Sequence, residues 1–201
     1  MFVLMGVFLD LVDIYPVYYL LIFIFVPISQ FLATPFLRLV GVYSYLSPML
    51  LVFTANKKSY DIHNGTSFDY LMVMRGVPAG VVWRTKILGY YMQGLLAIVQ
   101  QIEKGEIPES VEIKGSSYFF SESTARRIGF SMESTGLLTK LNIALNYLDL
   151  LWMYSIAHGR LRFPQLSTIR TAKISGKDLV LAKMEIERIH DYIVRKTHHA
   201  D

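Results

Sequence analysis

Hydrophobic and polar residues are distributed very unevenly along this 201-residue chain. Residues 1–55 contain three charged side chains, Asp10, Asp13 and Arg38, whereas charged residues recur throughout residues 56–201. This change in composition predicts two regions: residues 1–55 as a membrane anchor and residues 56–201 as a water-exposed domain.

Two apolar segments of the first region are predicted to be membrane spans. Residues 14–32 form a run of 19 residues without a charge. As a helix this run would be about 28 Å long, close to the hydrocarbon thickness of a bilayer at about 30 Å. Residues 36–54 form the second segment, with Arg38 near one end and Gly41 and Pro48 inside it. The short connection between the two segments predicts a transmembrane helical hairpin.

Three other interpretations of the first region stay open. A single span followed by a helix in the membrane interface would satisfy the same pattern, and so would the buried core of a soluble fold. A cleaved signal peptide fits less well, because Asp10 and Asp13 interrupt the apolar run. Lys57, Lys58 and Arg75 follow the second segment, so the positive-inside tendency places residues 56–201 in the cytoplasm.

The second region changes repeatedly between helix-like and strand-like patterns, which predicts a compact mixed α+β fold. Thr66 with Asp69, and Ser175 with Asp178, have the spacing of helix-capping pairs. Helices are expected over residues 67–75, 86–104, 122–128, 137–157 and 177–196, and strands over residues 59–63, 81–83, 111–120, 130–132 and 167–174.

The overall composition excludes two classes of protein. Hydrophobic residues make up 53 % of the chain and charged residues 18 %, which excludes an intrinsically disordered chain. The chain has no Cys, so it is not a disulfide scaffold. Its net charge of +4 is compatible with anionic partners.

One candidate catalytic pair lies where a predicted strand meets a predicted helix. His63 could act as a general base and Asp69 could orient it, within reach of a lipid head group at the membrane surface. The alternative is ordinary turn and cap chemistry, in which Asn64-Gly65 forms the turn and Asp69 supports a cap at Thr66.

Basic residues suggest a second candidate site, for anions. No acidic residue occurs between Asp149 and Asp178. The basic residues of this stretch are Arg160, Arg162, Arg170, Lys173 and Lys177. They could contact anionic lipid head groups or a phosphorylated substrate, or they could form a solvated basic face.

Other ligands are not indicated by the sequence. The basic residues are not interleaved with aromatic ones in a nucleic-acid-binding motif. No His-Glu-x-x-His motif and no Gly-rich phosphate loop occurs, so neither a metal nor a cofactor is expected.

Two functions follow from these observations. The first is a membrane-anchored binding or regulatory module whose basic cytoplasmic domain contacts the lipid bilayer, anionic head groups or another membrane protein. The second is a small membrane enzyme that acts on a lipid-linked or phosphorylated substrate and uses His63 and Asp69.

Overall fold

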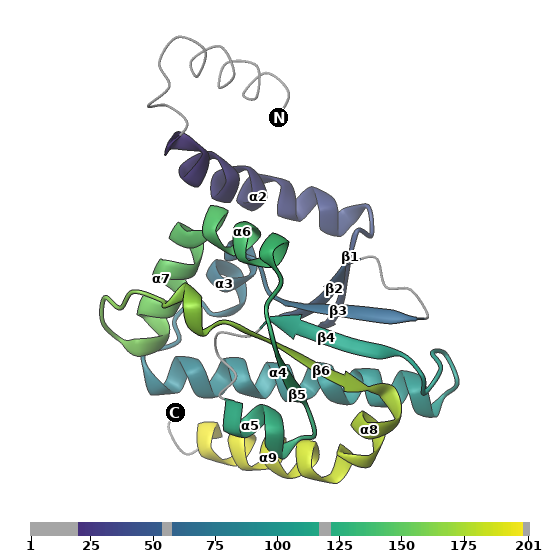
Figure 1. The fold of residues 1–201 in the computed structure, drawn as a ribbon. Coiled ribbons are helices and arrows are strands. Elements are labelled where there is room, and N and C mark those ends of the chain that lie inside the picture. Colours follow the sequence, from purple (N-terminus) through teal and green to yellow (C-terminus); the bar gives the residue numbers. More distant parts are fainter. Residues whose placement is uncertain (1–19, 54–57, 117–121, 199–201) are drawn as a thin grey trace.

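The computed structural model describes residues 20–53, 58–116 and 122–198 as one mixed α+β fold with a six-stranded sheet (Figure 1). The described elements, in chain order, are α2 (Ile22–Leu39), β1 (Tyr43–Ser47), β2 (Leu50–Phe53), β3 (Ser59–Asn64), α3 (Ser67–Val73), α4 (Val81–Glu103), β4 (Glu112–Ser116), α5 (Glu122–Arg127), β5 (Ser131–Ser134), α6 (Leu137–Leu145), α7 (Tyr147–His158), a 3-10 turn (Leu166–Thr168), β6 (Arg170–Ser175), α8 (Gly176–Leu181) and α9 (Lys183–His198).

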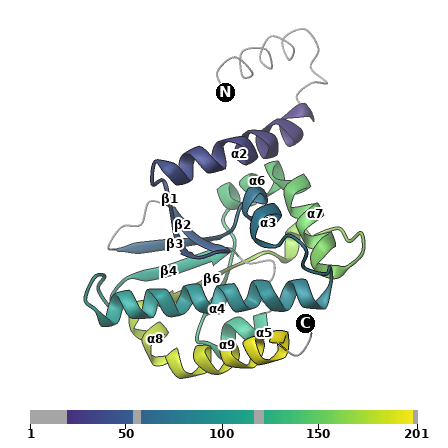
Figure 2. The same ribbon diagram turned by 180° about the vertical axis from the view of Figure 1, so that it is seen from behind.

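The sheet has the strand order β1-β2-β3-β4-β6-β5. β3 and β4 are parallel, and the other neighbouring strands are antiparallel. The crossover from β3 to β4 passes through α3 and the long helix α4. α4 contacts β1 and β2 along one side and α8 and α9 along the other. Figures 1 and 2 show α2, α6 and α7 at the end of the molecule opposite α8 and α9.

The hydrophobic core lies between the sheet and α4. Ile87, Leu95 and Ile98 of α4 are almost completely buried, as is Leu179 of α8. Their spacing along α4 is that of one helical face, which agrees with the helix predicted over residues 86–104. The structure therefore confirms the α+β class, and helices and strands together form its hydrophobic core.

The predicted second membrane span has a different structure. Residues 36–39 complete α2, and residues 43–53 form the antiparallel hairpin of β1 and β2. Leu50, Leu51 and Val52 are all buried, so β2 is covered on both of its faces. The sequence of a strand that is buried on both faces is a continuous apolar run, so its composition resembles that of a membrane span. The described residues therefore show no helical hairpin, and the sheet extends across the predicted boundary at residue 55.

The predicted first span is displaced along the chain. Residues 14–19 lie outside the described residues, and the helix runs from Ile22 to Leu39 with two prolines inside it. Within the described ranges, α2 is the one helix long and apolar enough to cross a membrane, by length and composition alone. Its mean hydropathy is 1.6, and 11 % of it is buried, so it is not an enclosed core helix.

Two of the predicted helices are each divided into two. The helix predicted over residues 137–157 breaks at Asn146, whose side-chain amide donates to the Asn142 carbonyl oxygen at 2.9 Å. The last predicted helix breaks at Ala182, between α8 and α9. In both places the apolar pattern continues through the break, so periodicity alone does not reveal it.

The strand predicted over residues 81–83 is wrong, because these residues form the first turn of α4. Thr85, which precedes the helix predicted over residues 86–104, lies inside α4 and donates its hydroxyl to the Val81 carbonyl oxygen at 2.8 Å. Gly80 occupies the cap position with φ = 93°, a conformation that favours glycine.

Candidate functional site

Asp69, one of the two predicted catalytic residues, is part of a buried helix cap. The residue is 1 % exposed, and its Oδ2 accepts hydrogen bonds from the Thr66 amide at 2.8 Å and from the Thr66 hydroxyl at 2.9 Å. The Tyr45 hydroxyl donates to the same oxygen at 2.8 Å. Burial and the neighbouring carboxylate raise the pKa of Tyr45, so its hydroxyl remains a donor. The Thr66 hydroxyl oxygen in turn accepts from the Asp69 amide at 3.4 Å, and this bond together with the one from the Thr66 amide forms the capping box that the Thr66–Asp69 spacing predicted.

His63, the other predicted catalytic residue, interacts with a different carboxylate. It lies on β3, and its Nε2 is 3.5 Å from Oδ1 of Asp61. Alternate residues of a strand share a face, so the two side chains lie on the same side of the sheet. The hydrogen bond from His63 lowers the pKa of Asp61, and the nearby Lys114 lowers it further. The structure thus supplies His63 with a carboxylate neighbour, but from its own strand.

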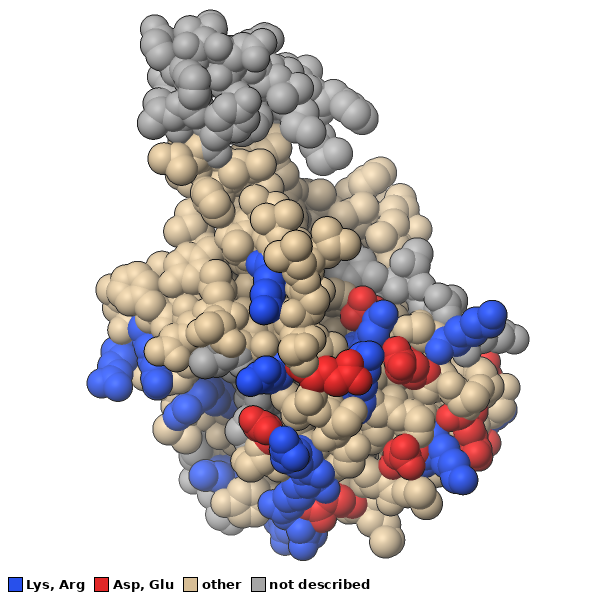
Figure 3. All heavy atoms as spheres, in the orientation of Figure 1, with Lys and Arg blue, Asp and Glu red and all other residues tan. Residues whose placement is uncertain are grey.

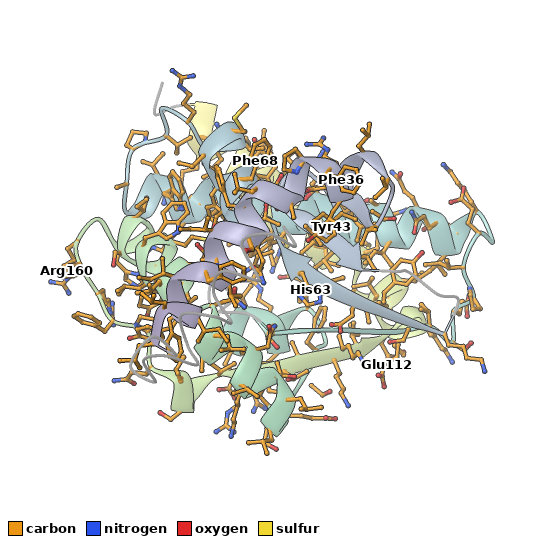
Figure 4. All side chains as sticks on the ribbon, turned by 90° about the horizontal axis from the view of Figure 1, so that it is seen from above. Phe36, Tyr43, His63, Phe68, Glu112 and Arg160 are labelled. Carbon is orange, nitrogen blue, oxygen red and sulfur yellow. The ribbon has the colours of Figure 1, made fainter. Side chains whose placement is uncertain are left out.

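The predicted anion-binding residues are spread over several elements. Arg160 and Arg162 follow α7, whereas Lys177 lies in the first turn of α8. Arg170 and Lys173 are an odd number of positions apart on β6, so they point to opposite faces of the sheet. In Figure 4, Arg160 lies far from His63.

One member of this set already has an acidic partner. The Lys173 ammonium is 2.8 Å from the Glu133 carboxylate, and this contact raises the pKa of Lys173. Lys and Arg also alternate with Asp and Glu over the lower half of the face in Figure 3. The structure therefore does not gather these basic residues on a single described element or face.

A cavity of about 380 Å³ lies beneath α2, at the ends of β3 and β4. His63 belongs to its lining, whereas Asp69 does not. The other polar residues of its wall come from five separate segments: Gln30, Asn64, Thr66, Ser67, Ser116, Thr139, Asn142, Asn146 and Asp149. The volume is within the range of small-molecule sites, about 300–1,000 Å³.

Two polar atoms in the residues of this wall have no hydrogen-bond partner among the described residues. They are the Ser67 hydroxyl and the Asn146 side-chain oxygen, and both are buried. Ser67 as a whole is 7 % exposed. A buried polar group without a partner costs roughly 1–3 kcal/mol, so such groups are expected at a site that a ligand completes.

A second cavity of about 350 Å³ adjoins the first and has a different character. Its lining is largely apolar and includes Pro27, Leu32 and Leu71. Phe31, Ser67 and Asp149 belong to the walls of both cavities. The α2–α3 contact is reinforced here by the rings of Phe31 and Phe68, whose centroids are 5.6 Å apart.

The residues of α6 and α7 in these walls were not predicted from the sequence. Asn142 and Asn146 are four positions apart, and Asp149 is the acidic residue of an otherwise apolar stretch. Polar residues that interrupt a buried helix pattern are a usable signal. Their convergence with His63 and Asn64 depends on the fold, so the spacing alone does not show it.

An exposed apolar surface covers the same end of the molecule. We call it the apolar cap, and its residues are Leu20, Leu21, Ile24, Ile28, Leu32, Phe36, Leu39, Val40, Leu137, Leu138 and Leu141. Leu39, Leu137 and Leu138 are each more than four-fifths exposed. In Figure 3, the described surface below the grey atoms at the top carries few charged side chains.

The charged residues of α2 and α6 lie at the border of the cap or extend from it. Arg38 is in the last turn of α2, with its guanidinium carbon 4.7 Å from the centre of the Tyr45 ring. Lys140 is exposed on α6. Long basic side chains of this kind can lie over apolar surface and still keep their charge in water.

The comparisons with known proteins give no relative. No protein-family model, no curated protein and no solved structure matches this chain. Within the described ranges, no group of three His, Asp or Glu residues is arranged to hold a metal ion. The function must therefore be argued from the two cavities and the apolar cap.

Proposed function

We propose that this protein is a membrane-anchored binding module that rests on the lipid bilayer through the apolar cap. The observation that carries this proposal is the unbroken row of exposed apolar residues along α2. Ile24, Ile28, Leu32 and Phe36 recur every four residues, and each is about half exposed or more. A contiguous exposed apolar surface of this kind marks a contact with a membrane or a partner.

The packing of α2 supports an orientation in the plane of the membrane. Its inner face, which includes Pro27 and Thr34, is buried against the domain, and the helix contacts α3, α6, α7 and β1. A helix crossing the bilayer would carry these neighbours into the lipid with it. A helix lying in the interface places only its outer face and the leucines of α6 there.

The cytoplasmic position of the domain stays a prediction from the sequence, because the positive-inside tendency applies to a chain that crosses the bilayer, whereas α2 is proposed to lie in the interface. The surface away from the apolar cap carries mixed charges (Figure 3), as expected for a surface in water. Under the enzyme hypothesis, the carboxylate that orients His63 would be that of Asp61, because the Asp69 carboxylate forms hydrogen bonds in the cap of α3.

Floatation of the full-length protein with phosphatidylcholine vesicles tests this proposal. We expect the parent protein to float with the vesicles and to resist extraction by alkaline carbonate. The double variant Ile28→Glu and Leu32→Glu should bind at least a hundredfold more weakly, because each aliphatic side chain kept out of the lipid costs about 1.5–3 kcal/mol, or about 3–6 kcal/mol for the pair.

The matched control is Leu181→Glu with Met184→Glu. These residues are 72 % and 79 % exposed, but they lie on α8 and α9 at the opposite end of the molecule. The control should therefore float as the parent does. Release of the parent protein by carbonate, or equal binding by both double variants, would contradict the proposal.

A further inference from the structure

The two adjoining cavities beneath α2 differ in polarity and meet at shared residues. Phe31, Ser67 and Asp149 line both of them. On one side of this junction the wall is rich in amide and hydroxyl groups, and on the other side it is almost entirely aliphatic and aromatic. A polar compartment joined to an apolar one matches a molecule that has a polar head and a hydrocarbon chain.

The chemistry of the polar cavity indicates an uncharged head group. Its described lining contains no Lys or Arg, and residues 117–121, which follow Ser116 in the sequence, include none either. The one imidazole of the described lining, His63, is 3.5 Å from the Asp61 carboxylate, which offsets a positive charge there. Asp149 is the carboxylate of this lining, and it would repel a phosphate. Amide and hydroxyl side chains both donate and accept hydrogen bonds, which is what a head group with many hydroxyls requires.

The unpartnered groups lie on both sides of this cavity. The Asn146 amide donates to the Asn142 carbonyl oxygen, which leaves the Asn146 side-chain oxygen as a buried acceptor without a donor. The Ser67 hydroxyl, at the start of α3, has no partner among the described residues either. Asp149 accepts from the Trp152 indole at 3.2 Å, and this contact places the carboxylate at the junction.

The apolar cavity is placed to receive a hydrocarbon chain from the membrane. Ile28 and Leu32 line it and also belong to the apolar cap, where they are 52 % and 60 % exposed. Leu71 of α3 lines the opposite side and is 54 % exposed. The groove between α2 and α3 is therefore continuous with the surface that we place in the bilayer.

We infer that the two cavities together bind one membrane lipid with an uncharged, hydroxyl-rich head group. The head group occupies the polar cavity, within contact of Asn142, Asn146 and Asp149, and an acyl chain occupies the groove between α2 and α3. This inference rests on the proposed membrane association, and it adds the class of ligand. It also distinguishes the protein from a module that selects anionic lipids.

Quenching of tryptophan by brominated lipids tests the inference directly. The chain has two Trp residues, Trp83 in the core and Trp152 in the wall of the apolar groove, so a brominated acyl chain in the groove lies against Trp152. The full-length protein is placed in phosphatidylcholine nanodiscs that contain brominated dihexosyl diacylglycerol, brominated phosphatidylglycerol or brominated phosphatidylcholine. We expect the glycolipid to give half-maximal quenching at about a tenfold lower mole fraction than the other two lipids, because its hydroxyls complete unpartnered hydrogen bonds.

Two substitutions in the polar cavity and one matched control complete the test. Ser67→Ala removes a hydroxyl without a partner, and Asn142→Leu removes an exposed amide, so the double variant should fold. We expect it to lose the preference for the glycolipid while it remains in the nanodisc. The control Gln93→Leu replaces an exposed amide on α4, outside both cavity walls, and should keep the preference.

The possible failures are distinguishable. Equal quenching by all three lipids, stronger quenching by phosphatidylglycerol, or an unchanged preference in the double variant overturns the ligand assignment and leaves membrane association standing. A parent protein that does not enter nanodiscs overturns the proposed function itself. If free disaccharide displaces the glycolipid at a similar concentration, the site recognises a soluble sugar and the lipid assignment is wrong.

Discussion

At the scale of single residues, Asp69 shows how a carboxylate six positions from a histidine in the sequence can form hydrogen bonds within a helix cap instead of with that histidine. Its Oδ2 accepts three hydrogen bonds, two from Thr66 and one from Tyr45, and the residue is almost completely buried. A buried carboxylate is tolerable when it is satisfied in this way. Its removal would leave the Tyr45 hydroxyl and the Thr66 amide without their acceptor.

We therefore predict that Asp69→Ala lowers the free energy of unfolding by about 3 kcal/mol, because the Thr66 amide, the Thr66 hydroxyl and the Tyr45 hydroxyl all lose a buried acceptor. Thr66→Ala should cost about 1 kcal/mol, as expected for the loss of an N-cap side chain. Both values can be measured by chemical denaturation of the purified protein.

The double variant Thr66→Ala and Asp69→Ala provides the internal check. The stability effects of substitutions within one hydrogen-bond network are not additive. The double variant should therefore lose less unfolding free energy than the sum of the two single variants. Thr66→Ser, which keeps the hydroxyl, should behave nearly as the parent. An Asp69→Ala protein as stable as the parent would show that the capping network contributes nothing.

At the scale of elements, local signals predicted the starts of α3 and α8 but not that of α4. The Thr66 and Ser175 caps form as their spacing indicated, because such caps depend on residues three positions apart. β1 and β2 were missed, because Leu50, Leu51 and Val52 are buried on both faces by contacts that lie far along the chain. The breaks at Asn146 and Ala182 were missed for a related reason, since packing and not local pattern fixes them.

The contact between α4 and β2 yields a prediction about packing. A Cβ added to Gly94 would lie 2.5 Å from Cδ2 and 2.9 Å from Cβ of Leu50, so the helix and the strand approach each other too closely for any side chain here. Gly94→Ala should lower the free energy of unfolding by about 1–3 kcal/mol, the usual cost of overpacking a core.

The same helix offers the matched control. A Cβ at Gly89 would be 3.1 Å from Cγ2 of Ile193, a single contact that a shift of a few tenths of an ångström relieves. Gly89→Ala should therefore change stability by less than about 1 kcal/mol, because the gain in helix propensity offsets the contact. If thermal unfolding places both variants at the same midpoint, the close approach of α4 and β2 is not a constraint on the fold.

At the scale of the whole molecule, the candidate site is assembled from segments that the sequence keeps far apart. The polar cavity takes Gln30 from α2, His63 and Ser67 from the region of β3 and α3, and Asn146 from the junction of α6 and α7. The sequence indicated His63 and the turn after it as a candidate site. It could not indicate the other walls, because only the fold brings α2, α6 and α7 to one end of the sheet.

The remaining question at this scale is the orientation of α2, which decides how the cavities face the membrane. Ile24 and Phe36 are the two ends of the exposed row along α2, twelve positions apart, and they lie about 120° apart around the helix axis, on either side of the middle of the row. A spanning helix would place them about 18 Å apart in depth, at about 1.5 Å per residue. An interfacial helix would place both at a similar depth, about 5–10 Å into the boundary between head groups and acyl chains.

Spin labels can measure this difference cleanly, because the chain has no native Cys and each introduced Cys is the only one. We predict equal depths for nitroxides at Ile24→Cys and Phe36→Cys in phosphatidylcholine vesicles, and an aqueous position for the label at Met184→Cys. The equality follows from the burial of Pro27 and Thr34 against the domain, which fixes the helix along the protein surface. A depth difference near 18 Å would instead mean that α2 crosses the bilayer, and the groove between α2 and α3 would then have to open within the hydrocarbon core.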